Sequence, residues 1–219
     1  MDSQVFKRFV KNKATIIGSA VLLVFLTMAV LGSALCTYDP NAIDLANVYQ
    51  HPSVKHLLGT DNLGRDTLAR LVIGARISLL VSFVGTIAGS IIGVFLGVGA
   101  GYFGGRLDSV ISRFVDLLLA FPGLLLAIVV VAVLGNGIVN TMAAIAFYSI
   151  PYIARMVRGI VLTLKNSEYV QACQVMGASD TRIIMTHIIP NAMSQIIIFS
   201  SRNGGTAILP SSPPPRLCL

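Results

Sequence analysis

ISLLVSFVGTIAGSIIGVFLGVGA, residues 77–100, is the stretch that decides the fold. It contains no charged side chain, and about 20 apolar residues are enough to cross a bilayer as a helix. Glycine recurs at every fourth position, which on a helix gives one stripe without side chains. Such a stripe lets a second membrane helix approach closely. The stripe consists of Gly85, Gly89, Gly93, Gly97 and Gly101. The pattern predicts a membrane-spanning helix packed tightly against a neighbour.

The composition extends this prediction to the whole chain. Of the 219 residues, 55% are hydrophobic and 11% are charged, whereas soluble domains are about 25% charged. The net charge is +7, but the cations flank the apolar blocks instead of forming one patch, so we expect contact with membrane lipid and not with nucleic acid. The fold class is therefore an all-α polytopic membrane protein with four complete transmembrane helices and an incomplete fifth. The predicted spans are Ala14–Cys36, about Ile77–Ala100, Leu117–Leu134, Ile138–Ala154 and the short Asn191–Ser200.

The distribution of cations predicts the orientation. With the N-terminus inside, ten Lys or Arg residues fall in inner segments and four in outer ones, as the positive-inside bias requires. The inner cations are Lys7, Arg8, Lys11, Lys13, Arg106, Arg113, Arg155, Arg158, Lys165 and Arg182. The outer cations are Lys55, Arg65, Arg70 and Arg76. Residues 1–13 are then a cytoplasmic basic segment, and residues 37–76 are an external loop.

Several sites are not expected. No ionisable residue lies near the middle of a predicted span, where ion-coupled carriers and intramembrane enzymes usually keep one. Asp108, Arg113 and Asp116 lie at the inner boundary and predict an interfacial ion pair. The glycines of residues 99–104 match a dinucleotide fingerprint, but they end a membrane helix instead of following a strand. The three cysteines and three histidines have no metal-ligand spacing. We therefore predict no catalytic residue, metal site or cofactor site.

Residues 167–190 predict two short helices that form a rigid knob on the cytoplasmic side. Ser167 can cap the first, with Glu168 in its first turn, where the helix dipole favours an acid. Gly177 can end that helix. Ser179 and Asp180 repeat the pattern for the second helix, and Pro190 is expected to bound it.

Two segments carry a family likeness. The first is GTDNLGRD, residues 59–66, followed by RLVIGARIS, residues 70–78. The second is EYVQACQVMGASD, residues 168–180, running on to HIIPN, residues 187–191. Together they resemble the inner-membrane permeases of ABC importers for dipeptides, oligopeptides and nickel, over about residues 1–200. The resemblance implies the type I importer permease-like helix bundle, with residues 14–200 as the transmembrane permease domain.

In that family a cytoplasmic loop with a Glu-Ala-Ala motif docks on the ATPase, which implies the same role for residues 159–190. Gln171 stands where the motif has Glu, and Cys173 stands where it has its second Ala. The residues to which the resemblance gives this role are Glu168, Gln171, Ala172, Gly177, Ala178, Ser179, Asp180 and Pro190.

The resemblance also implies the partners: a second homologous permease subunit, two cytoplasmic ATPase subunits that bind the ATP, and an external solute-binding protein. The location implied is the bacterial inner membrane. Short peptides are the expected substrate, and nickel or a nickel chelate is the alternative within the family. A membrane-embedded enzyme or protease and a non-transporting membrane scaffold are the alternatives from other classes.

The external loop and the tail complete the expectations. Gly59 and Gly64 predict a structured turn, and Asp66 can cap the helix that leads into the second span. A calcium loop is the alternative, but its ligand spacing does not match. Residues 201–219 carry prolines and polar residues, so we expect a disordered, aberrant tail from a truncated or frame-shifted product. The glycine stripe would then lack part of its neighbouring surface, and the chain would be inactive in uptake.

Overall fold

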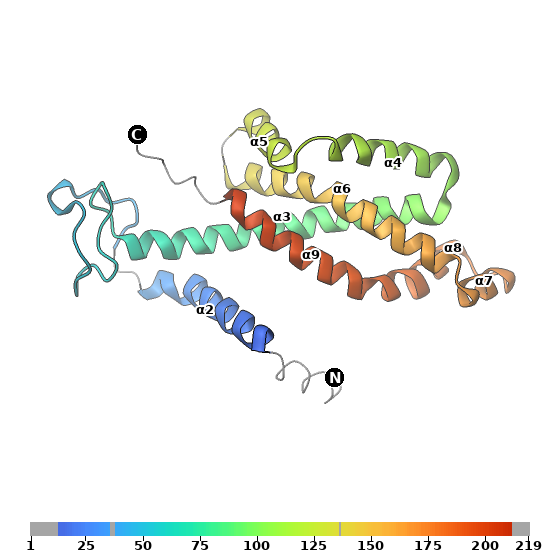
Figure 1. The fold of residues 1–219 in the computed structure, drawn as a ribbon, viewed down its shortest axis with the longest axis horizontal. Coiled ribbons are helices and arrows are strands. Elements are labelled where there is room, and N and C mark those ends of the chain that lie inside the picture. Colours follow the sequence, from blue (N-terminus) through green and yellow to red (C-terminus); the bar gives the residue numbers. More distant parts are fainter. Residues whose placement is uncertain (1–12, 36–37, 136, 212–219) are drawn as a thin grey trace. The chain divides into compact units, whose positions relative to one another are not determined.

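The computed structural model describes residues 13–35, 38–135 and 137–211, and these residues are mainly helical (Figure 1). Within them a single bridge between Thr60 and Asp66 is the only β-type pairing. The helices are α2 (Lys13–Leu35), α3 (Thr67–Phe103), α4 (Gly105–Leu119), α5 (Gly123–Leu134), α6 (Ile138–Lys165), α7 (Glu168–Val175), α8 (Asp180–Ile183) and α9 (Ile189–Ser211). A short 3-10 helix, η1 (Leu45–Asn47), lies in the connection between α2 and α3, and a π-helical turn, η2 (Ile184–Ile188), joins α8 to α9.

Among the residues that the structure describes, three helical stretches are long and apolar enough to cross a membrane: Thr67–Phe103, Ile138–Lys165 and Asp180–Arg202. Shorter apolar helices cover Ile16–Gly32 and Leu125–Leu134. The prediction of an all-α membrane protein is therefore confirmed, with differences in where individual spans begin and end.

The chain divides into two compact units, Met1–Leu79 and Leu80–Leu219. In the first unit α2 meets the beginning of α3 at Gly32. A Cβ at Gly32 would lie 2.5 Å from Cγ1 of Val72, so the glycine allows this approach. Val72 and Ala69 are buried there.

The second unit is built around α6. This helix contacts α4, α5 and α9, and the glycine stripe of α3 lies along it. A Cβ added at any of the five glycines would fall between 2.5 and 2.9 Å from an atom of α6. The facing residues of α6 recur every fourth position, so one ridge of side chains fills the glycine groove. They are Ile145, Ser149, Ile153, Val157 and Val161. The expectation that the stripe lacks a neighbour is wrong, because α6 occupies it along its whole length.

The third predicted span is two helices instead of one. The helix α4 ends at Leu119 and α5 begins at Gly123, with Pro122 at the N-cap of α5 in a non-helical conformation (φ −55°, ψ 125°). Proline offers no N–H to a helix, and it disfavours helical geometry in the residue before it. The expected continuous helix Leu117–Leu134 is therefore wrong. Pro151, by contrast, lies inside the continuous helix α6.

The region after Pro190 also differs from the prediction. The helix α9 has 23 residues and reaches Ser211, so a helix of span length does form there. Pro190 is its second residue and does not bound the preceding helix. The π-helical turn just before it carries a hydrogen bond from Ile189 N–H to the Ile184 carbonyl, five residues back. The change of hydrogen-bond register lies directly before Pro190, which has no N–H to donate, so the helix continues through the proline. Of the predicted disordered tail, residues 201–211 are helical, and residues 212–219 lie outside the described residues, as do residues 1–12 and Cys36.

Candidate functional site

The connection between α6 and α9 forms a compact knob of two short helices, α7 and α8. Gly177 adopts a φ of +78°, the left-handed geometry that ends a helix. Its N–H donates to the Gln174 carbonyl at 3.0 Å, and the Ala178 N–H donates to the Cys173 carbonyl at 3.1 Å. These two bonds make a Schellman motif, which satisfies the last carbonyls of α7. The predicted helix end at Gly177 is present.

The starts of the two helices differ from the prediction in one detail. Ser167 and Ser179 occupy the N-cap positions, but neither side chain caps its helix. The Ser167 hydroxyl donates instead to the Leu164 carbonyl. Glu168 and Asp180 do lie in the first turns, where the helix dipole stabilises a negative charge.

The base of the knob is anchored in the core of the second unit. Val170 of α7, Ile183 of α8 and Ile188 of η2 are all fully buried. They share one hydrophobic cluster with Val157 and Val161 of α6. Because each short helix contributes a buried side chain to the same core, the knob is held as a body and is not a loose loop.

The opposite side of the knob is exposed. Val175 and Met176 at the tip are 89% and 77% exposed, although both are apolar. Ala178 is half-buried and packs on the core beneath. The other seven residues to which the resemblance assigns ATPase docking are exposed: Glu168, Gln171, Ala172, Gly177, Ser179, Asp180 and Pro190. The structure thus brings these residues to one segment with an open face and an apolar tip.

The knob also meets the end of α3 through Tyr102, a residue that the sequence analysis did not select. The Tyr102 hydroxyl donates to Oδ1 of Asp180 at 2.7 Å. The Lys165 ammonium donates to the Tyr102 carbonyl at 2.6 Å and lies 5.5 Å from the centre of its ring. Tyr102 is 78 positions from Asp180, so no local pattern could have indicated this contact.

Two ion pairs join α4 to α6. Arg158 donates two hydrogen bonds to Asp108, from Nε at 2.5 Å and from Nη2 at 2.7 Å. Arg155 pairs with Asp116. The hydrogen bonds from Arg158 hold the pKa of Asp108 below its ordinary value against the opposing effect of burial. The acids predicted to form an interfacial pair therefore pair with arginines of α6, and Arg113 is not their partner in these bonds.

A cavity of about 260 Å³ lies beside these pairs, between α3, α4 and α6. Ala100 and Ala154 form part of its apolar wall, while Ser112, Asp116 and the two arginines supply polar groups. Each charged group of the wall already has a partner, because Asp116 pairs with Arg155 and Arg158 pairs with Asp108.

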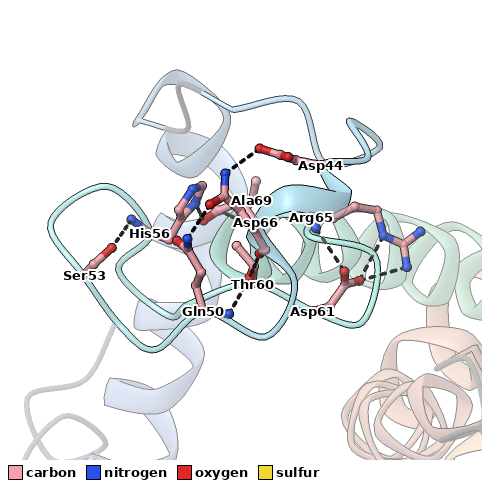
Figure 2. Close-up of polar contacts among 10 residues, drawn as sticks. Asp44, Gln50, Ser53, His56, Thr60, Asp61, Arg65, Asp66 and Ala69 are labelled. Carbon is pink, nitrogen blue, oxygen red and sulfur yellow. Dashed lines mark hydrogen bonds and ion pairs between the residues drawn. The ribbon is translucent and has the colours of Figure 1, made fainter.

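The turn before α3, which the sequence predicts to be external, is organised by two aspartates, and Figure 2 shows their contacts. Asp66 accepts a hydrogen bond from the Ala69 N–H at 2.8 Å and thereby caps α3 as predicted. Its other oxygen lies 3.0 Å from Nδ1 of His56. Asp61 accepts from the N–H of Leu63 and of Arg65 at 2.9 and 3.0 Å and also pairs with the side chains of Arg65 and Arg70. These carboxylates are engaged with N–H donors in the manner of a structured turn.

The charge of Asp61 is strongly favoured. Burial alone would raise its pKa, but the hydrogen bonds from Arg65, Leu63 and Arg70 hold the pKa well below the ordinary value of 3.8. Two glycines make the turn possible. Gly59 and Gly64 have φ values of +71° and +72°, and a Cβ at Gly64 would lie 1.7 Å from the Asp44 carbonyl oxygen. No residue with a side chain fits at Gly64 without moving the backbone.

Comparison with known proteins identifies relatives along most of the chain. Residues 93–209 match the family model of the binding-protein-dependent transport system inner membrane component. Residues 3–52 match the N-terminal transmembrane domain of oligopeptide transport permease C.

Individual relatives extend these matches. The dipeptide transport system permease protein DppC of Alkalihalophilus pseudofirmus is 39% identical over 206 residues, which cover 94% of this chain and 68% of the relative. The glutathione transport system permease protein GsiD of Pectobacterium atrosepticum is 39% identical over 205 residues, covering 93% and 68%. The GsiD protein of Escherichia coli O157:H7 gives the same identity and coverage.

Proposed function

Because the chain belongs to the family of binding-protein-dependent transport system inner membrane components, we propose that residues 159–190 form the surface on which its ATPase subunits dock. The chain is a multi-pass permease subunit of a peptide importer in the bacterial inner membrane, and it is not an enzyme. Transport in this family is driven by partner ATPases, so this chain needs a surface that contacts an ATPase and follows its movement.

One observation carries the docking proposal: the knob of α7 and α8 is buried at its base and open at its tip. A surface that receives force needs a rigid attachment, which the fully buried Val170 and Ile183 supply. It also needs a contact face, and the exposed apolar pair Val175 and Met176 suits a hydrophobic pocket on a partner. The acids in the first turns of the two helices add charges at the rim.

The remaining partners follow from the same proposal. Two ATPase subunits hold the ATP, and this chain holds no cofactor. A second, homologous permease completes the path through the membrane, and an external solute-binding protein delivers the substrate. The relatives described above are named for a dipeptide and for glutathione, which are both short peptides. We therefore take short peptides as the cargo. Nickel, the alternative within the family, gains no support from these names.

A photo-crosslinking experiment on the assembled transporter tests the docking surface. A photoreactive amino acid replaces Met176 in one variant and Val54 of the external loop in the other, because both native side chains are apolar and largely exposed. We expect the Met176 variant to crosslink to an ATPase subunit and the Val54 variant not to do so. If an assembled, active transporter gives no ATPase crosslink from position 176, the docking proposal is wrong.

A further inference from the structure

Tyr102 occupies the junction between the glycine stripe and the knob. It directly follows Gly101, the last glycine of the stripe, and its side chain is only 3% exposed. Its ring lies in the same hydrophobic cluster as Val170 and Ile183 of the knob. A buried tyrosine normally finds a partner for its hydroxyl, and here the partner is a charged residue of the knob.

Three contacts converge on this one residue. Its hydroxyl donates to Asp180 at the start of α8, at 2.7 Å. The side chain of Gln174 in α7 also interacts with that hydroxyl. Lys165, the last residue of α6, donates to its carbonyl at 2.6 Å. Tyr102 thus touches both helices of the knob and the helix that leads into it.

The glycine stripe makes this attachment important for the position of α3. The stripe itself presents no side chains to α6, and the α3 side chains that pack beside it, Val94 and Val98, make apolar contacts without hydrogen bonds. Tyr102 is the first residue beyond the stripe with a large side chain, and that side chain is bonded to the knob. The end of α3 is therefore held in register with the knob by a side chain and not only by the covalent chain through α4, α5 and α6.

We propose that Tyr102 is a positioning residue that ties the knob to α3, so that a displacement of α7 and α8 is passed directly to the glycine-striped helix. The Tyr102–Asp180 hydrogen bond transmits the movement. Lys165 holds Tyr102 in place through its carbonyl and its ring. This inference rests on the proposed docking of the ATPase at the knob. It adds a mechanical link to α3 that docking alone does not require.

The alternative is that Tyr102 only fills space in the core. Tyr102→Phe distinguishes the two, because it keeps the buried ring and removes the hydroxyl that reaches Asp180. Tyr169→Phe is the matched control, since its hydroxyl belongs to α7 but contacts Asn191 of α9, at 3.3 Å, and not α3.

The measurement is peptide uptake and ATP hydrolysis in the same proteoliposomes, using the complete transporter and a labelled dipeptide. Because the hydrogen bond from the hydroxyl to a charged acceptor is lost, we expect Tyr102→Phe to lower the uptake per ATP hydrolysed about fivefold. The amount of ATPase that co-purifies should stay unchanged. Tyr169→Phe should retain the whole ratio.

Three outcomes would overturn the inference. The first is an unchanged ratio in Tyr102→Phe, which leaves only a packing role. The second is an equal loss in Tyr169→Phe, which removes the specificity for α3. The third is loss of the ATPase from the Tyr102→Phe complex, which would make the residue part of the docking fold. Failure of the docking proposal itself shows separately, as a missing ATPase crosslink from position 176 in the unaltered background.

Discussion

The contact between the glycine stripe and α6 predicts a large effect for the smallest substitution at Gly97. A Cβ at this position would lie 2.7 Å from the Ala154 carbonyl oxygen and 2.7 Å from Cβ of Val157. Both atoms belong to the backbone or the first carbon of a side chain, so rotation of a flexible side chain cannot relieve the contact. The two helices must separate by several tenths of an ångström, and the loss of contact spreads along the stripe.

Gly99 of the same helix is the matched control. A Cβ there would have one neighbour, Cδ1 of Ile111 at 3.9 Å, which is an ordinary contact. Alanine improves helix propensity over glycine by about 1 kcal/mol at both positions. The difference between Gly97→Ala and Gly99→Ala therefore isolates the overpacking cost, which is typically about 1–3 kcal/mol.

Thermal unfolding of the detergent-solubilised chain, followed with a thiol-reactive dye, measures this difference. Cys173 is half-buried and packs against the core of the second unit, so it becomes reactive as that unit opens. For a chain of this size 1 kcal/mol corresponds to roughly 2–4 °C in Tm. We expect Gly97→Ala to unfold some 2–12 °C below Gly99→Ala, by the product of the two ranges. Equal midpoints would refute the argument that α6 fills the stripe.

Three further predictions concern the knob, the external turn and the orientation. At Gly177 a Cβ meets nothing within 4 Å, so only the positive φ opposes substitution. ATPase co-purification should therefore fall from Gly177→Asn to Gly177→Ala to Gly177→Val, while Gly159→Val, where a Cβ also meets nothing, should retain it. An equal loss in all three Gly177 variants would contradict a requirement for left-handed backbone at this position. Asp61→Asn should speed hydrogen exchange in residues 44–66 at pH 7. The pKa of Asp61 is depressed in the folded turn, so the stability that its charge contributes is complete above the ordinary pKa of 3.8 and declines below it. The difference in exchange rate between Asp61→Asn and the native chain should therefore shrink as the pH falls below 3.8. A difference that stays constant with pH would contradict a role for the charge. A cysteine at Ser53 should react with an impermeant maleimide from outside the cell, and labelling only from the cytoplasm would reverse the orientation.

The sequence predicted the membrane class, most helices and the glycine stripe because these depend on local composition and on the helical period. It did not identify the partner of the stripe. Glycine at every fourth position marks one smooth face, but it does not indicate which helix supplies the ridge that contains Ile153 and Val157. That choice depends on packing between residues far apart in the chain.

The two errors in helix boundaries both concern proline, and they run in opposite directions. Pro122 lies inside the predicted span Leu117–Leu134, and it separates α4 from α5. Pro190 was expected to stop a helix, and it lies in the first turn of α9. A proline's missing N–H costs little in a first turn or beside a π-helical turn, and much more inside a regular helix. The outcome depends on the register of the residues before it, which the residue type alone does not reveal.

The knob shows the same division between local and distant information. Gly177 and the acids Glu168 and Asp180 are local signals, and each lies where the sequence places it. The serines beside those acids occupy cap positions without capping, because a hydroxyl can donate to a preceding carbonyl instead, as Ser167 does. The contact that we propose to transmit force, between Tyr102 and Asp180, spans 78 positions and involves a residue with no recognisable motif. Asp180 was selected for its place in the motif, yet its carboxylate accepts a bond from the interior of the protein. Substituting it therefore alters the attachment to α3 as well as the surface charge, and only the comparison with Tyr102→Phe separates the two effects.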